Sequence, residues 1–269
     1  MKILKLSDFD QRQGIMMTSY GKPSSGKTTF GGTWPTPILF VHTGEIGLKV
    51  LEGMTDIDVV DVPNSATAQA VFTEIGKSQA IRDKYKTIVV DSLHCLREVQ
   101  IREYAGEIDW AKITQFVLAQ VNHLIPLMSA GVNILLISHE TIKEVEGSRL
   151  KTVVLPSMGE RTSQGIIGKC DVVGYHAIET VRTFDQAANK TTSDTQFVCY
   201  LRPHPMYYTR MRVRDASRIP EKIVDPTFDK IKALFRPTAV KPKPAPKAAK
   251  PPKAKPPKRK PKGAQHATV

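Results

Sequence analysis

Short apolar runs alternate with longer amphipathic stretches along residues 13–235. The apolar runs have the length and β-branched content of strands, and the clearest are Gly14–Tyr20, Pro37–His42, Ile57–Val62, Thr87–Asp91 and Val132–Ser138. Between them, Ser65–Ile81 and Trp110–Met128 carry apolar residues at helical spacing. Strands that alternate with helices predict an α/β fold with a mostly parallel central sheet flanked by helices.

The pattern changes beyond Asp171, where strand-like runs follow one another without long helices between them. These runs are Val172–His176, Phe197–Leu201 and Met206–Arg214. We expect them to pair antiparallel at one edge of the main sheet. A last amphipathic stretch, Thr227–Phe235, predicts a closing helix, so residues 1–236 are expected to form one domain.

Composition changes sharply after Arg236. Residues 237–269 hold ten Lys or Arg, no Asp or Glu, and nine prolines. Removing their charge of +10 from the total of +13 leaves only +3 for residues 1–236. A segment with so few apolar residues is predicted to be a disordered, polyproline-like basic tail. Such a polycation binds nucleic acid without sequence preference, whereas the alternative is a solubilising spacer.

The three cysteines, Cys95, Cys170 and Cys199, are far apart and form no C-x-x-C pair, which favours a reducing compartment over a structural zinc site. The first residues lack the apolar core of a signal peptide, and no apolar run approaches membrane-spanning length. These features predict a soluble, cytoplasmic protein with no membrane partner.

Residues 21–28, GKPSSGKT, fit the phosphate-binding loop G-x-x-x-x-G-K-[ST] at every fixed position. A predicted strand precedes the loop, and Thr28–Phe30 opens a short helix, as this motif requires. Lys27 is expected to reach the β- and γ-phosphates of ATP, and the Thr28 hydroxyl to hold Mg²⁺. The nucleotide-binding candidates are Gly21, Ser24, Ser25, Gly26, Lys27, Thr28 and Thr29.

Three further polar residues follow predicted strands. Asp91 ends the apolar strand Thr87–Asp91 and is the second candidate ligand of Mg²⁺, although strands also end in ordinary turn aspartates. Glu45 follows Pro37–His42 and is positioned to polarise water, or is merely a solvated loop acid. His139 follows Asn133–Ser138 and is either a γ-phosphate sensor or a capped or solvated histidine.

The order of these motifs resembles a RecA-type ATPase core, and P-S-S-G-K-T-T at residues 23–29 is similar to the RecA version of the loop. More closely, the chain resembles small phage-encoded RecA-like ATPases of the Sak type, which consist of a core alone and take part in single-strand annealing and recombination. The resemblance runs from about Gly14 to Leu234. It implies Glu45 as catalytic base and His139 as sensor.

The resemblance also implies a DNA-binding role for parts of the chain. Residues 140–168 correspond to a mobile DNA-binding loop, although acidic residues dilute its charge and an ordinary solvated loop stays open as an alternative. Its basic candidates are Lys143, Arg149, Lys151 and Arg161, followed by Lys169. The expected partners are single-stranded DNA, a single-strand-binding protein and further copies of this chain, with nucleotide at subunit interfaces.

Arg210, Arg212 and Arg214 alternate along Met206–Arg214, which predicts that all three lie on one face of a strand. In RecA-like assemblies a strand at this position sends basic residues into the neighbouring subunit's site, so Arg212 and Arg214 are the candidates for catalysis in trans. The alternative is that these charges protect an exposed strand edge from aggregation.

Two other functions remain compatible with these motifs. One is a DNA-binding or annealing protein in which the nucleotide is a switch with little turnover. The other is a nucleotide or small-molecule kinase, with residues 202–214 as a lid. DNA-stimulated hydrolysis favours the ATPase, whereas phosphoryl transfer to a nucleoside monophosphate favours the kinase.

Overall fold

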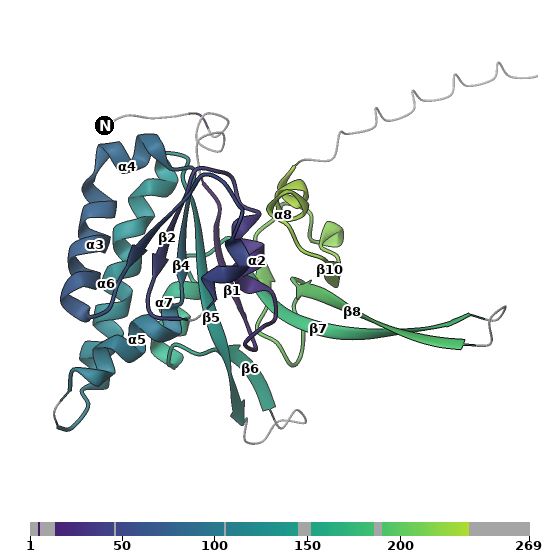
Figure 1. Cartoon of the computed structure of the whole chain (residues 1–269). Coiled ribbons are helices and arrows are strands. Elements are labelled where there is room, and N and C mark those ends of the chain that lie inside the picture. Colours follow the sequence, from purple (N-terminus) through teal and green to yellow (C-terminus); the bar gives the residue numbers. More distant parts are fainter. Residues whose placement is uncertain are drawn as a thin grey trace, which may run out of the picture. The chain divides into compact units, whose positions relative to one another are not determined.

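A ten-stranded mixed sheet forms the centre of the protein. The computed structural model describes residue 5 and residues 14–45, 47–104, 106–144, 152–185 and 190–236 (Figure 1). Six parallel strands lie in the order β7-β1-β5-β4-β2-β3. They span Met16–Gly21 (β1), Ile38–His42 (β2), Ile57–Asp61 (β3), Thr87–Asp91 (β4), Asn133–Glu144 (β5) and Val172–Asp185 (β7).

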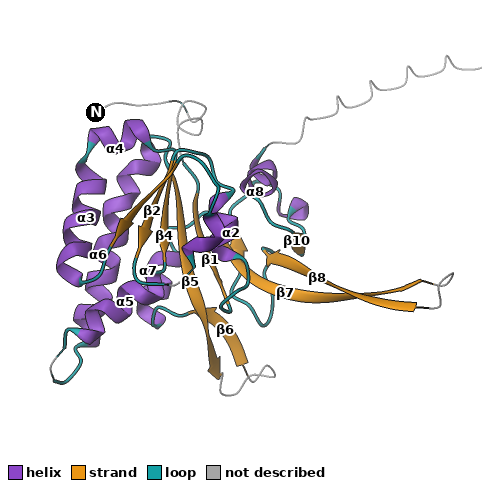
Figure 2. Cartoon of the chain, in the orientation of Figure 1, coloured by secondary structure: helices purple, strands orange, loops and turns teal. Residues whose placement is uncertain are grey.

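Helices cover both faces of this sheet (Figure 2). One face is covered by α3 (Ser65–Lys77), α5 (Leu93–Arg102), α6 (Trp110–Ser129) and α7 (Glu160–Ile167), and α4 (Gln79–Lys84) follows α3. The other face is covered by α2 (Lys27–Gly32) and α8 (Phe228–Phe235). Strands buried on both faces are apolar at nearly every position, which explains why their sequences are continuous apolar runs.

Successive residues of β4 illustrate this two-sided burial. Ile88 and Val90 pack among the side chains of α3, α5 and α6, whereas Val89 packs with Phe30 of α2 on the opposite face. In α6, a stripe of Ile113, Val117, Val121 and Leu124 is buried, as its helical spacing predicts. The helix begins after Asp109, whose carboxylate accepts the N–H groups of Ala111 and Lys112.

The remaining strands are antiparallel to their neighbours. They are β6 (Thr152–Pro156) beside β5, β8 (Lys190–Tyr200) and β9 (Arg210–Met211) beside β7, and β10 (Lys222–Val224) beside β8. Beyond the sheet, β7 and β8 continue as a two-stranded ribbon that projects away from the helices (Figure 1). We call Val172–Asp185 and Lys190–Tyr200 together the β7–β8 ribbon. The predicted antiparallel edge is therefore confirmed.

Three expectations about secondary structure are wrong. The predicted strand Met206–Arg214 is reduced to Arg210–Met211, so Arg214 lies outside any strand and the three arginines do not share a strand face. The predicted helix Ser65–Ile81 is divided at Ser78, which ends α3 and caps α4. The described parts of residues 140–168 are not a loop but the end of β5, β6 and α7, because β5 and β6 form a hairpin.

Some expectations concern residues outside the described part of the chain. These are Arg149, Lys151 and the basic tail from residue 237 onward.

Two short 3₁₀ helices, η1 (Leu48–Leu51) and η2 (Ala216–Arg218), complete the described elements. Within the described residues, no helix combines the length and apolar character needed to cross a lipid bilayer.

Candidate nucleotide site

The phosphate-binding motif forms the turn between β1 and α2, as its sequence predicts. Gly21 ends β1 beside β7, and a Cβ atom placed there would lie 2.1 Å from the carbonyl oxygen of His176. Gly26 has φ +81°, a left-handed conformation that favours glycine, and caps the start of α2. Both glycines are therefore required by the backbone path, which turns the loop tightly before Lys27.

The Lys27 side chain folds back over this loop. Its ammonium group donates to the carbonyl oxygens of Gly21 and Lys22 at 3.1 and 2.7 Å, and to Ser25 Oγ at 3.3 Å. Burial lowers the pKa of Lys27, while the carboxylates of Glu45 and Asp91 act in the opposite direction. A buried cation held in the concavity of the loop is positioned to exchange these carbonyls for phosphate oxygens.

Asp91 faces the first turn of α2. Thr28 Oγ1 donates to Asp91 Oδ2 at 2.8 Å, whereas Asp91 Oδ1 is buried without a hydrogen-bond partner among the described residues. Burial raises the pKa of Asp91 to about 6, Glu45 adds to this effect, and Thr28 and Lys27 oppose it. A buried carboxylate oxygen without a hydrogen-bond partner is stabilised by a nearby positive charge. This arrangement suits a divalent cation beside Thr28.

A reciprocal pair of hydrogen bonds clamps the ends of β2 and β4 together. The Ser92 N–H donates to Thr43 Oγ1 at 2.8 Å, and the Thr43 hydroxyl donates to the Ser92 carbonyl at 2.7 Å. The Thr43 N–H also donates to the Asp91 carbonyl at 3.0 Å. Since Thr43 is fully buried, this clamp fixes the segment that leads to Glu45 against the end of the Asp91 strand.

Glu45 and His139 contact each other at the same edge of the sheet. Glu45 Oε1 and His139 Nε2 are 2.5 Å apart, and both side chains are partly buried. Burial alone would raise the pKa of Glu45, but hydrogen bonds from His139 and Ser92 and the nearby charges lower it overall. Glu45 is therefore an ionised carboxylate at neutral pH.

The strand order explains why these groups converge. β5 lies between β1 and β4, so its carboxyl end is between the phosphate-binding loop and Asp91. His139 pairs with Gly21 in the register of β1 and β5. Ligands bind at the carboxyl ends of strands in open parallel sheets, and Lys27, Thr28, Glu45, Asp91 and His139 all lie there.

The sequence alone does not predict the roles of three residues near the site. Thr43 forms the clamp, and His94 of α5 stacks on His139 with ring centroids 5.0 Å apart. His176 is fully buried next to Phe30 and the phosphate-binding loop, and burial lowers its pKa to about 3, so its ring is neutral. Only the position of His94 close behind Asp91 hinted at a role.

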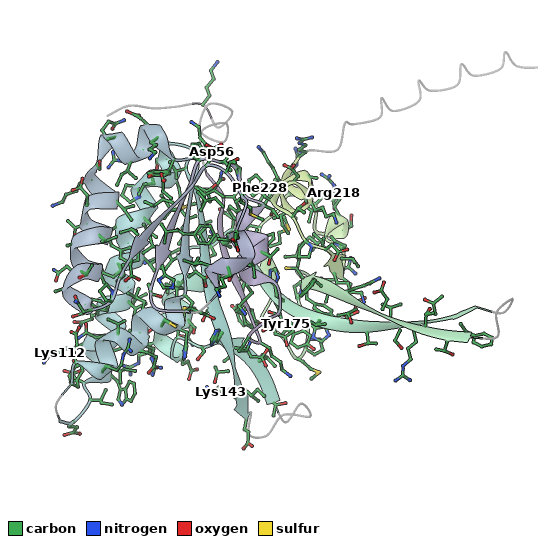
Figure 3. The ribbon with its side chains drawn as sticks, in the orientation of Figure 1. Asp56, Lys112, Lys143, Tyr175, Arg218 and Phe228 are labelled. Carbon is green, nitrogen blue, oxygen red and sulfur yellow. The ribbon has the colours of Figure 1, made fainter. Side chains whose placement is uncertain are left out.

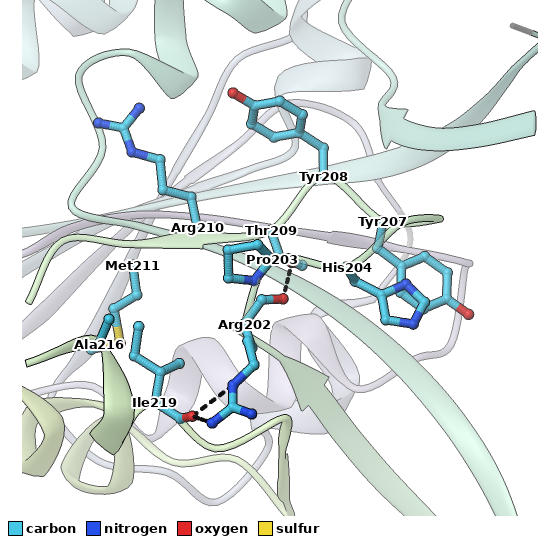
Figure 4. A pocket seen from close by; sticks show the side chains of 10 residues that line it. All are labelled: Arg202, Pro203, His204, Tyr207, Tyr208, Thr209, Arg210, Met211, Ala216 and Ile219. Carbon is cyan, nitrogen blue, oxygen red and sulfur yellow. Dashed lines mark hydrogen bonds between the residues drawn. The ribbon is translucent and has the colours of Figure 1, made fainter. Parts of the chain in front are cut away.

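The arginines lie away from this edge. Arg210 of β9 pairs with Val173 of β7, which pairs with Thr18 of β1, so Arg210 is about 10 Å along β1 from Gly21. Arg212 donates to the carbonyl of Gly168, and Arg210 lines a cavity of about 620 Å³ (Figure 4). Arg210 and Arg212 therefore do not join the site of their own chain.

The described DNA-binding candidates lie on different elements. Lys143 near the end of β5 (Figure 3) forms an ion pair with Glu160 at 2.7 Å. Arg161 of α7 lines a cavity of about 550 Å³ together with Arg97 and Trp110. The Arg97 guanidinium lies 5.1 Å from the centre of the Trp110 ring, which is 54% exposed.

The mostly parallel sheet and the phosphate-binding loop at the end of β1 define the fold of a P-loop NTPase. Residues 13–213 match the family described as "AAA domain", and the chain belongs to this family. The flagellar accessory protein FlaH from Methanocaldococcus jannaschii is similar in structure, with a TM-score of 0.42, 12% identity, and coverage of 82% of this chain and 92% of FlaH. No curated protein matches the sequence.

Proposed function

We propose that this protein binds ATP with Mg²⁺ and hydrolyses it at the edge formed by the phosphate-binding loop, Asp91, Glu45 and His139. The observation that carries the proposal is the Glu45–His139 contact beside the Thr28–Asp91 pair. Membership of the AAA domain family supports the ATPase assignment. A phosphate-binding loop alone would support only nucleotide binding.

The residues beside the loop fit a magnesium ion. Thr28 Oγ1 would be a direct ligand, and Asp91 would hold the ion through its unpartnered Oδ1 and a water molecule. When bound, Mg²⁺ neutralises charge on the β- and γ-phosphates. Lys27 supplies a second positive charge on the same oxygens, since its ammonium group already lies in the loop.

Glu45 would orient the attacking water and accept its proton, because it is ionised and faces the loop region from the end of β2. His139 contacts the Glu45 carboxylate directly. A terminal phosphate would compete for the His139 N–H and release the carboxylate toward the water. His139 would thus couple phosphate binding to activation of the base.

A pair of variants tests the mechanism by measuring nucleotide binding and turnover separately. Lys27→Ala is expected to lower hydrolysis by about 100-fold or more, with weakened ATP binding. Glu45→Gln is expected to bind ATP normally but to hydrolyse it about 100- to 10,000-fold more slowly. Glu52→Gln, at an exposed acid nearby, is the matched control. Hydrolysis at the wild-type rate by Lys27→Ala would refute the proposal.

Single-stranded DNA is the proposed partner, in recombination or annealing of the Sak type. Support comes from the ten cations of residues 237–269 and from the exposed Trp110, which lies beside Arg97 in a cavity that Arg161 also lines. An aromatic ring beside arginines suits a stacked base and its phosphate. Lys143 contributes less, because Glu160 already neutralises it. DNA-stimulated turnover supports an ATPase, whereas DNA binding with unchanged turnover supports a switch.

Arg212 and Arg214 are proposed to act only from a neighbouring copy, since Arg212 lies near the amino ends of the central strands. Such catalysis requires an oligomer with nucleotide at its interfaces. The rate per subunit should then rise with protein concentration. In mixtures, Lys27→Ala subunits should restore activity to Arg212→Ala or Arg214→Ala subunits, because they supply an intact arginine to a neighbouring site that keeps its own Lys27. Absence of this rescue for both arginines would refute the trans role.

A further inference from the structure

Two apolar side chains are exposed at the base of the β7–β8 ribbon. Phe197 of β8 and Ile178 of β7 are directly paired, and they are 40% and 47% exposed. The second pair toward the sheet, His176 and Cys199, is completely buried. Side chains alternate along a strand, so Phe197 and Ile178 lie on the same face as this buried pair. That face is the one covered by α2.

The Phe197 ring lies directly against the phosphate-binding loop. A Cβ atom placed on Gly26 would be 2.9 Å from Phe197 Cδ1 and 3.4 Å from Cε1 and Cγ. The ring therefore packs on the backbone of the residue that precedes Lys27, yet a large part of it remains open to solvent. An exposed aromatic ring in this position has room for a further flat group on its free surface.

The position of the metal site gives the direction of the bound nucleotide. Thr28, Asp91, Glu45 and His139 lie over β5 and β4, on one side of β1. The terminal phosphate must point toward these groups, since they hold the metal and activate water. The nucleoside at the other end of the phosphate chain then leaves on the opposite side of β1, which is the side of β7 and β8.

We propose that Phe197, supported by Ile178, is the platform on which the base of the nucleotide stacks. The inference rests on the proposed ATP binding and adds to it the site of the base. Stacking of a base on an aromatic side chain contributes about 1–3 kcal/mol, and it needs no particular hydrogen-bonding edge. The platform is thus a source of affinity for the nucleoside and leaves phosphate binding to the loop.

Calorimetric titration of the full-length protein separates these two parts of the ligand. Mg²⁺–ATP and Mg²⁺–tripolyphosphate are titrated into the wild type, Phe197→Ala and Phe184→Ala. Phe184 is the matched control, because it is an exposed phenylalanine on the same face of the ribbon but lies far from the loop. Phe197→Ala is expected to weaken ATP binding by about 5- to 150-fold and to leave tripolyphosphate binding unchanged. Phe184→Ala should change neither.

The outcomes distinguish the platform from the underlying function. If the wild type binds neither ligand, the proposed ATP binding itself fails. If the wild type binds ATP and Phe197→Ala binds it equally well, the platform is refuted. An equal loss for ATP and tripolyphosphate also refutes it, because the ring would then only support the loop. Phe197→Trp is the second variant, for use if Phe197→Ala does not fold, because it keeps an aromatic ring at this position. It should retain ATP affinity, and its fluorescence should change with ATP but not with tripolyphosphate.

Discussion

His42 links two acceptors at the end of β2. Its Nδ1 lies 2.8 Å from the Asp61 carboxylate, and its Nε2 lies 2.6 Å from the Glu45 carbonyl. Burial favours the neutral ring, but the hydrogen bonds to Asp61 and Glu45 outweigh it, so the pKa of His42 is raised above its ordinary value. Only the protonated ring donates from both nitrogens. His42 therefore favours the imidazolium form and orders the segment that carries Glu45.

We expect an NMR titration to place the His42 midpoint above that of a free histidine, and Asp61→Asn to lower it. Because the folded-state pKa is raised, the stability that this pair contributes is fully present below the ordinary pKa and is lost as pH rises through the raised value. The difference in urea midpoint between wild type and Asp61→Asn should thus be larger at pH 6 than at pH 8.5. Asp83→Asn is the control, and an unchanged His42 titration in Asp61→Asn contradicts the prediction.

Among single residues, the sequence predicts those whose positions are set by a short continuous motif. Lys27 and Thr28 follow from the loop motif, and their placement beside Asp91 agrees with that expectation. The direct contact between Glu45 and His139 was not predicted, since 94 positions separate them and only strand order brings them together. Phe197 gave no signal either, because its role depends on the ribbon that passes Gly26.

The clamp between β2 and β4 is a property of elements, because one side chain joins two strand ends. Thr43→Val keeps the shape of the side chain but leaves the buried Ser92 N–H without its acceptor, whereas the Ser92 carbonyl still accepts the Leu96 N–H. We expect a loss of about 1–3 kcal/mol in the free energy of unfolding. Hydrolysis should fall as well, since Asp91 and Glu45 lose their common support. Urea denaturation and steady-state turnover measure the two effects.

Thr180→Val, at an exposed position of the β7–β8 ribbon, is the control for the Thr43 substitution. It exchanges the same atoms without removing a buried acceptor, so stability and turnover should stay near those of the wild type. Equal effects of the two substitutions would show that the Thr43 hydroxyl has no special role in joining the strands.

Helix α3 has an N-cap that can be removed without touching the site. The Asn64 side chain accepts the N–H of Thr67 at 2.8 Å, which satisfies one of the free donors of the first turn. Asn64→Ala is expected to cost about 1 kcal/mol in urea denaturation, with unchanged turnover. Gln69→Ala, in the exposed middle of the same helix, should not destabilise the protein. A loss of the same size in both variants would contradict the capping role.

The elements that the sequence predicts well are those buried on both faces. β4 agrees with its predicted bounds, since five consecutive buried residues produce a continuous apolar run. The outer arm of β8 was not predicted, because Lys190–Gln196 is almost entirely polar and is held by pairing with β7. Arg210–Met211 is short for a related reason: the segment follows β7 for only two residues before it turns toward η2. Pairing between distant segments leaves little trace in a local pattern.

For the whole molecule, the decisive feature is the separation of charge between residues 1–236 and 237–269. The second segment holds ten of the thirteen net positive charges. If it contacts about five phosphates of single-stranded DNA, its removal should make the log–log dependence of affinity on salt shallower by roughly 3.5. Fluorescence anisotropy with an oligothymidylate at several salt concentrations measures this slope for the full chain and for residues 1–236.

A variant in which glutamine replaces all ten cations of residues 237–269 separates charge from length. If the segment binds phosphates, this variant and the truncated chain should have the same shallow slope. If the segment is only a spacer, the neutral variant should bind with the affinity and slope of the wild type. Turnover measured in the same samples tests which segment couples DNA binding to ATP hydrolysis. The site lies wholly within residues 21–139, so DNA that still reaches Trp110 and Arg161 should stimulate hydrolysis in the truncated chain, at higher DNA concentration.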